Sequence, residues 1–249
     1  MTRLISLPHR AHRILLACGL AATFGAGPAL AQGSAVNTGA IKLTAGVDFP
    51  SIYYFRGIRQ EVDPTLTLWP YGDVGITLAK RMSVNFGVWN SLHTGSSGSK
   101  VPGKGMHYEE RFYSSLTLGL RGATVSAKYI AYTSPNLSYA TIKEMDVQLT
   151  GRQKYAPYAL VAFELSDKGQ ADAGAKKGTY VELGAGPHWP IGKWTFTIPI
   201  SVGLSAKNYY ETATKDNKFG FADVGGMITI PFSGAASKSG AWNVHGSVN

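Results

Sequence analysis

The sequence predicts an all-β protein, an antiparallel transmembrane β-barrel of about twelve strands when complete. Three observations support this prediction: apolar and polar residues alternate with a period of two, the alternating segments are long, and tight and long connections take turns along the chain. No segment after residue 31 shows a helical period. We count eleven candidate strands, and bacterial single-chain barrels carry even numbers. We therefore expect the chain to be truncated at Asn249 and to lack its closing strand.

The clearest strand is 194–204, where apolar and small polar residues alternate almost without error. At about 3.3 Å per residue its apolar face is long enough for a tilted strand that crosses a bilayer. The other predicted strands, in chain order, are 41–49 continuing through 53–60 with a bend at Pro50, then 65–79, 84–92, 112–120, 123–133, 141–151, 158–166, 179–186, 219–232 and 241–248.

The connections between these strands differ in length. Tight turns are expected at Lys80-Arg81, at Gly122 and at Pro190-Ile191. Long, polar or glycine-rich loops are expected at 94–106, 134–140, 167–178 and 206–217. Outer-membrane barrels are organised in this way, with short periplasmic turns and longer outer loops.

Residues 1–31 read as a secretory signal peptide. Three arginines precede an apolar stretch at 14–26, and Ala29-Leu30-Ala31 supplies a small-residue cleavage site before Gln32. The apolar stretch is too short for a membrane-spanning helix. Cleavage after Ala31 leaves a barrel domain at 32–249 without a cysteine, because Cys18 is the only one. The predicted location is the bacterial outer membrane.

The composition limits the partners. The predicted mature chain keeps 21 of the 24 basic residues and all 15 acidic residues, a net charge of +6. Its basic residues are scattered, so we expect no nucleic-acid partner. Outer-membrane lipid and small hydrophilic solutes are the expected partners, and no cofactor or metal is expected, because the histidines are isolated and no metal-binding or dinucleotide motif occurs.

A soluble β-sandwich also alternates, but three features favour a membrane barrel. The strands are longer than usual sandwich strands. Aromatic residues such as Trp69, Tyr132 and Tyr209 gather near strand ends, as in interfacial girdles, although sandwich edges can also hold aromatics. The predicted inner faces carry charges that a dry core could not hold but a hydrated lumen could: Arg111, Glu144, Asp146, Glu164 and Glu182.

Residues 51–60, with the sequence SIYYFRGIRQ, resemble the signature SDYxFRGISQ near the N-terminus of the TorF-type porins. Ile52 and Arg59 depart from the pattern, and segments at 87–91 and 242–244 are also similar to family segments. The matching residues are Ser51, Tyr53, Phe55, Arg56, Gly57, Ile58 and Gln60. The resemblance implies an outer-membrane porin without a defined substrate. Family members continue with another hairpin, which agrees with the expected truncation.

We predict a porin-like barrel that passes small hydrophilic solutes and is not an enzyme. Arg56, Arg111 and the four inner carboxylates are the candidates for selectivity. Alternatively, Arg56 only neutralises one of these carboxylates. A second hypothesis is a non-conducting barrel that binds a partner through loops 94–106, 167–178 and 206–217. A third is a barrel enzyme that acts on lipid or peptide with Asp146, Glu164 and His107, recognisable by a carboxylate and an imidazole within hydrogen-bond reach.

Overall fold

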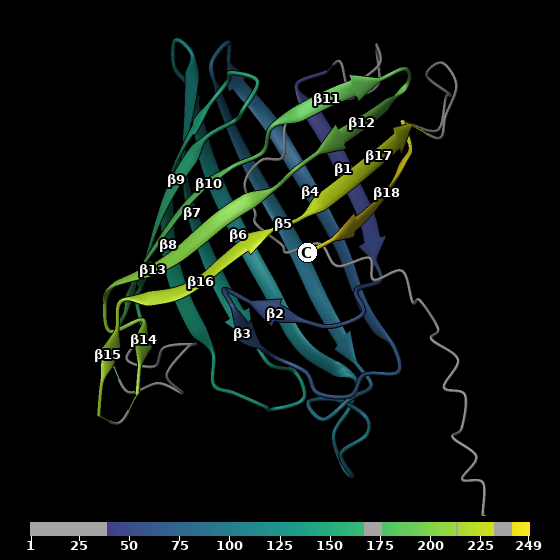
Figure 1. Ribbon diagram of the computed structural model, residues 1–249, viewed down its shortest axis with the longest axis vertical. Coiled ribbons are helices and arrows are strands. Elements are labelled where there is room, and N and C mark those ends of the chain that lie inside the picture. Colours follow the sequence, from purple (N-terminus) through teal and green to yellow (C-terminus); the bar gives the residue numbers. More distant parts are fainter. Residues whose placement is uncertain (1–38, 167–175, 213, 232–240) are drawn as a thin grey trace, which may run out of the picture.

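The computed structural model describes residues 39–166, 176–212, 214–231 and 241–249 (Figure 1). In this part of the chain every regular element is a β-strand, and every strand pairing is antiparallel. These residues hold no helix of the length and apolarity that membrane crossing needs. The predicted all-β antiparallel class is confirmed. The predicted signal peptide at 1–31 lies outside the described residues.

Ten strands form one large sheet, in the order β1-β4-β5-β6-β7-β8-β9-β10-β13-β16. Figure 1 shows that this sheet curls, so that β13 and β16 pass in front of the strands at the back. The strands are β1 (Ile41–Asp48), β4 (Thr67–Ala79), β5 (Met82–His93), β6 (His107–Gly119), β7 (Ala123–Thr133), β8 (Ile142–Gly151), β9 (Tyr158–Glu164), β10 (Thr179–Ala185), β13 (Ile200–Lys207) and β16 (Phe219–Val224).

A second sheet continues the first. Its strands, in the order β11-β12-β17-β18, are β11 (His188–Ile191), β12 (Trp194–Thr197), β17 (Gly226–Pro231) and β18 (Asn243–Val248). Only Gly186-Pro187, Ile198-Pro199 and Gly225 separate β10 from β11, β12 from β13, and β16 from β17. Proline cannot donate to a ladder, which explains two of the breaks. Hydrogen bonds from Ile198 N to Pro187 O at 3.0 Å and from Gly225 N to Pro199 O at 2.9 Å join the strands across them.

The first predicted strand is partly wrong. β1 ends at Asp48, and the segment predicted to continue it instead forms a two-stranded hairpin of β2 (Tyr54–Phe55) and β3 (Ile58–Arg59). Arg56 and Gly57 at its turn have φ angles of 48° and 78°. Two consecutive positive φ values define a type I′ turn, which reverses the chain within two residues. A second small hairpin pairs β14 (Tyr210–Glu211) with β15 (Asp216–Asn217).

The large sheet buries charged side chains on one face and exposes large apolar side chains on the other. On β8, Glu144, Asp146 and Gln148 are 0%, 3% and 8% exposed, whereas Val147 and Leu149 at the alternate positions are 41% and 49% exposed. The same inversion occurs on β9, β10 and β6. Their exposed members include Phe163, Leu183 and Phe112, and their buried charged members are Glu164, Glu182 and Arg111. This is the reverse of an antiparallel sheet that packs its apolar face on a core and exposes its polar face to water.

Glycines on the buried face make room for aromatic rings of the next strand. A Cβ added at any of four glycines would overlap the ring opposite it. The cross-strand pairs are Gly46 with Tyr71, Gly87 with Tyr113, Gly184 with Tyr158, and Gly203 with Phe221. The rings therefore lie flat against the inner wall, and the register places a residue without a side chain opposite each of them.

The structure corrects the assignment of some aromatic residues to an interfacial girdle. Trp69, Tyr132 and Tyr209 are only 1–2% exposed. Trp69 and Tyr132 pack with Tyr53 and Phe55 of the β2–β3 segment. A girdle residue must reach the membrane surface with its ring, and these rings face the inside instead.

Candidate functional site

The structure buries all the inner charged residues that the sequence singled out. Arg111, Glu144, Asp146, Glu164 and Glu182 are between 0% and 6% exposed. They come from four strands, β6, β8, β9 and β10, and they share the buried face of the sheet. The hairpin β2–β3 brings Arg56 to this face although it is 88 residues away from Glu144 in the sequence.

Arg56 and Glu144 form the centre of the site. The guanidinium donates two hydrogen bonds to the carboxylate, at 2.7 and 2.9 Å, and a third to Tyr209 Oη at 2.8 Å. It also lies over the ring of Tyr180, 4.1 Å from the centroid. Tyr132 Oη donates to Glu144 at 2.9 Å. A planar guanidinium matches a carboxylate in this two-pronged geometry, which fixes orientation as well as charge.

Arg111 has its own partner, Glu109, which the sequence reasoning missed. Arg111 Nε donates to Glu109 Oε1 at 2.5 Å, and Arg111 Nη2 donates to Tyr53 Oη. Both guanidinium groups approach the Phe55 ring: the Cζ atoms of Arg56 and Arg111 are 5.0 and 4.7 Å from its centroid. Glu109 could have been found, because residues two apart on a strand share a face.

The remaining inner carboxylates have other partners. Glu182 accepts hydrogen bonds from Tyr158 Oη at 2.6 Å and from Tyr180 Oη. Glu164 accepts one from the backbone of Gly178 at 2.5 Å. Asp146 faces Lys128 Nζ at 3.9 Å and is within hydrogen-bond reach of the Glu144 carboxyl group. The structure thus brings Arg56 to Glu144 and not to the other three.

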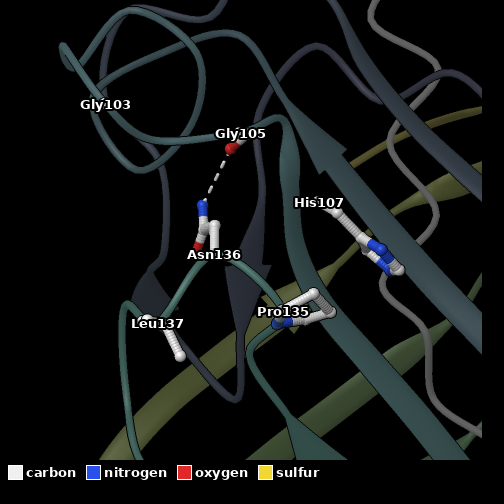
Figure 2. A pocket seen from close by; sticks show the side chains of 6 residues that line it. All are labelled: Gly103, Gly105, His107, Pro135, Asn136 and Leu137. Carbon is white, nitrogen blue, oxygen red and sulfur yellow. Dashed lines mark hydrogen bonds between the residues drawn. The ribbon is translucent and has the colours of Figure 1, made fainter.

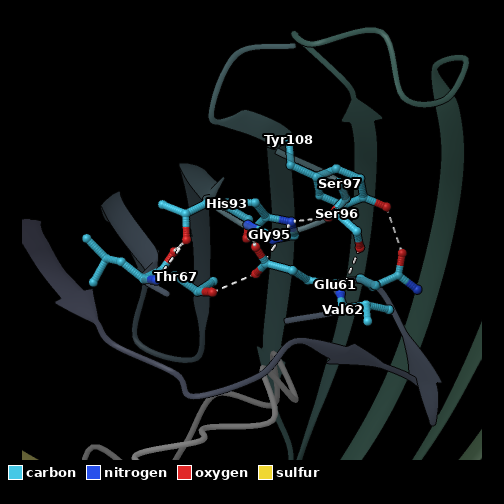
Figure 3. A network of polar contacts seen from close by, with 12 residues as sticks. Glu61, Val62, Thr67, His93, Gly95, Ser96, Ser97 and Tyr108 are labelled. Atoms are coloured by element: carbon cyan, nitrogen blue, oxygen red, sulfur yellow. Dashed lines mark hydrogen bonds and ion pairs between the residues drawn. The ribbon is translucent and has the colours of Figure 1, made fainter. Parts of the chain in front are cut away.

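A second polar network lies at the end of β5 beside the loop that follows it (Figure 3). Buried Glu61 accepts hydrogen bonds from Thr67 Oγ1 and from the Gly95 backbone, both at 2.6 Å. Desolvation raises the pKa of Glu61 above its usual value, and these two hydrogen bonds oppose the shift. The His93 ring stacks on Tyr108 with 4.3 Å between the centroids. This network ties the segment before β4 to the loop 94–106.

A chain of hydrogen bonds runs through this network. Trp69 Nε1 donates to Ser91 Oγ at 2.8 Å, and an indole nitrogen cannot accept. Ser91 Oγ in turn lies 2.7 Å from His93 Nε2, and His93 Nδ1 lies 2.7 Å from Ser97 Oγ. Glu61 Oε2 is 3.8 Å from Nδ1, beyond hydrogen-bond length. Ser91 and His93 are fully buried, so a substrate has no access to them here.

His107 does not complete an acid pair. Its Nε2 lies 2.9 Å from Asn90 Oδ1, and the residue lines a small cavity of about 220 Å³ together with Pro135 and Asn136 (Figure 2). Within the described ranges, no group of three or more His, Cys, Asp or Glu side chains is arranged to hold a metal ion. The hydrogen bond from Asn136 Nδ2 to Gly105 O at 3.0 Å ties two loops together beside this cavity.

Comparisons with protein-family models, with curated proteins and with solved structures give no match. The resemblance of residues 51–60 to the TorF-type porins therefore stays a prediction from the sequence.

Proposed function

We propose that the mature chain is an outer-membrane β-barrel of the porin-like kind, through which small hydrophilic solutes or ions pass passively. The observation that carries this proposal is the inverted polarity of the sheet. Large apolar side chains such as Phe86, Phe112 and Leu183 are at least half exposed on one face, while charged side chains are buried on the other. An exposed face of large apolar side chains is the kind of surface that contacts lipid in a membrane barrel.

The arrangement of the strands supports a closed barrel. The ten strands of the large sheet together with β18 make a wall of eleven, because β11, β12 and β17 only prolong strands that are already counted. His245 Nε2 of β18 lies 3.1 Å from Asp48 Oδ1 of β1, so the first and last strands of this wall approach each other.

The inward side chains near the tight turns support a hydrated interior at that end. Asp73, Asn85 and Tyr113 are only partly buried, which fits a space open to water there.

Two experiments test the proposal. Membrane fractionation after cell lysis should recover the mature protein with the outer membrane, and recovery from the aqueous fraction without detergent would overturn the barrel. Planar-bilayer recordings of the full-length mature protein should then detect ion conductance. A complete lack of conductance at all voltages and salt concentrations would overturn passage through the lumen, while leaving the barrel standing.

One observation favours a second candidate, a non-conducting barrel that binds a partner through its long loops. Arg111, Glu144 and Tyr180 are 0–1% exposed although they face the inside of the sheet. An open water-filled pore would leave such side chains exposed. The two candidate functions differ in whether the side chains that fill the lumen around Arg111, Glu144 and Tyr180 can move aside and open a path.

A further inference from the structure

The hairpin β2–β3 is the only described element that fills the inside of the sheet without belonging to the wall. β2 pairs with β3 and, within the described residues, with no other strand. Figure 1 shows the hairpin in the space enclosed by the curled sheet, nearer the end with the long loops. Its backbone ladder therefore contributes nothing to the wall, and side chains provide its attachment.

The base of the hairpin contacts one side of the wall. The ring of Tyr53 packs against Trp69 of β4 and Trp89 of β5, with centroid distances of 5.2 and 5.9 Å. Its hydroxyl donates to Glu109 of β6 at 3.2 Å. Tyr53 is 1% exposed, so no water layer separates the hairpin from these three strands.

The tip of the hairpin contacts the other side. Arg56 is paired with Glu144 of β8 and lies over Tyr180 of β10. The backbone oxygen of Arg56 accepts a hydrogen bond from Tyr210 Oη at 2.9 Å. A Cβ added to Gly57 would come 2.7 Å from Cβ of Phe221 on β16. The hairpin thus spans from β4 to β16 across the interior.

We propose that the hairpin Tyr54–Arg59 is a plug that closes the lumen at this level, and that the Arg56–Glu144 ion pair is the lock that holds it in place. This inference rests on the proposed porin-like barrel. Removing the Arg56 side chain takes away the ion pair with Glu144 and leaves at the tip the Phe55–Tyr132 ring contact and the hydrogen bond from Tyr210 Oη to the backbone, with Tyr53 holding the base. The hairpin can then swing about its base while the wall keeps all its backbone hydrogen bonds.

The distribution of charge explains why a single pair can act as a lock. Arg56 and Glu144 are buried to 10% and 1% side-chain exposure, so neither can turn to water without moving the hairpin. Removing one partner leaves the other as an uncompensated buried charge, which is far more costly than losing a surface pair. Removing one partner therefore destabilises the plugged state relative to the open state, because only the plugged state buries the remaining charge.

The test compares Arg56→Asn with Arg59→Asn. Asparagine tolerates the positive φ of position 56, so the turn survives while the guanidinium is lost. Arg59 is an exposed arginine of the same hairpin whose Nε donates only to Glu61 O at 2.8 Å, and it serves as the matched control. In planar bilayers we expect R56N to raise the open probability of the full mature chain at least tenfold over wild type, and R59N to leave it unchanged.

A second readout does not need conductance. Ala162 on β9 is 0% exposed and packs with Tyr180 and Tyr209, the residues that Arg56 covers. We introduce Ala162→Cys and measure its reaction with a small charged thiol reagent in lipid vesicles. The R56N background should react at least tenfold faster than the wild-type and R59N backgrounds. Equal rates in all three would overturn the plug.

The two readouts separate the inference from the proposed function. Faster labelling without conductance supports the plug and overturns solute passage. Wild-type conductance that R56N does not change, with equal labelling, overturns the plug and supports the channel. If R56N does not fold, Glu144→Gln removes the same charge pair from the wall and should also speed labelling, and a rate equal to wild type would overturn the lock.

Discussion

Replacing Gly87 by alanine tests the packing of the inner wall. The added methyl group would lie 2.2 Å from Cζ and Oη of Tyr113, directly across from it on β6. The ring must move, and its hydroxyl then loses the 3.2 Å hydrogen bond to Asp73. Overpacking costs about 1–3 kcal/mol and a hydrogen bond to a charged group about 1.5 kcal/mol. Removing a strand glycine returns about 0.5–1 kcal/mol. We expect G87A to lower the free energy of unfolding by about 2–3 kcal/mol.

Urea unfolding in lipid vesicles, followed by tryptophan fluorescence, measures this change. Gly72→Ala is the matched control, because the nearest atom to its Cβ is Thr44 O at 3.9 Å, and its effect should be within about 0.5 kcal/mol. In a Tyr113→Ala background the clash is gone, so G87A should cost close to nothing and the double-mutant cycle should show a coupling of about 2 kcal/mol. An effect of G87A equal to that of G72A, or an equal cost with and without the Tyr113 ring, would show that the ring does not clash with a side chain at position 87.

Three further changes probe the outer face, the loop network and the seam. Val147→Arg should lower the free energy of unfolding in vesicles by about 2–4 kcal/mol if this outward position faces lipid, whereas an effect below about 0.5 kcal/mol would indicate water. The pKa of Glu61 is raised in the folded protein, so the free energy of unfolding should fall as pH rises from about 4 toward that raised pKa. Glu61→Gln should remove this part of the pH dependence, and an unchanged pH dependence would contradict the role of Glu61. Asp48→Asn and His245→Gln should each lower the free energy of unfolding, and their double-mutant cycle should show a coupling of about 1 kcal/mol. Additive effects would show that the 3.1 Å contact contributes nothing to stability.

Alternation along the chain predicted most of the strands and the face that each residue occupies. The predicted strand 123–133 coincides with β7, and 65–79 differs from β4 by two residues at its start. On β8 the parity of Glu144 and Val147 was enough to assign one to the buried face and the other to the exposed face. A strand has a side-chain period of two whatever surrounds it, so local sequence carries this information.

The prediction of an aromatic girdle was wrong for Trp69 because it relied on residue type and ignored which face of the strand the residue occupies. Trp69 shares its parity on β4 with Thr67 and Asp73, which are polar and face inward. The parity of Trp69 therefore predicts that its ring faces inward. Tryptophan near a strand end favours an interface only if its face of the strand points outward.

The amino-acid sequence by itself determined the strands, their two faces and the inward direction of the charged residues, because these depend on neighbours one or two positions apart. Only the tertiary structure decided that residues 54–59 leave the wall as a hairpin and that Arg56 selects Glu144 among the inner carboxylates. That choice joins residues 88 positions apart. It depends on the curvature of the whole sheet, which brings β8 opposite the hairpin tip and which no local pattern encodes.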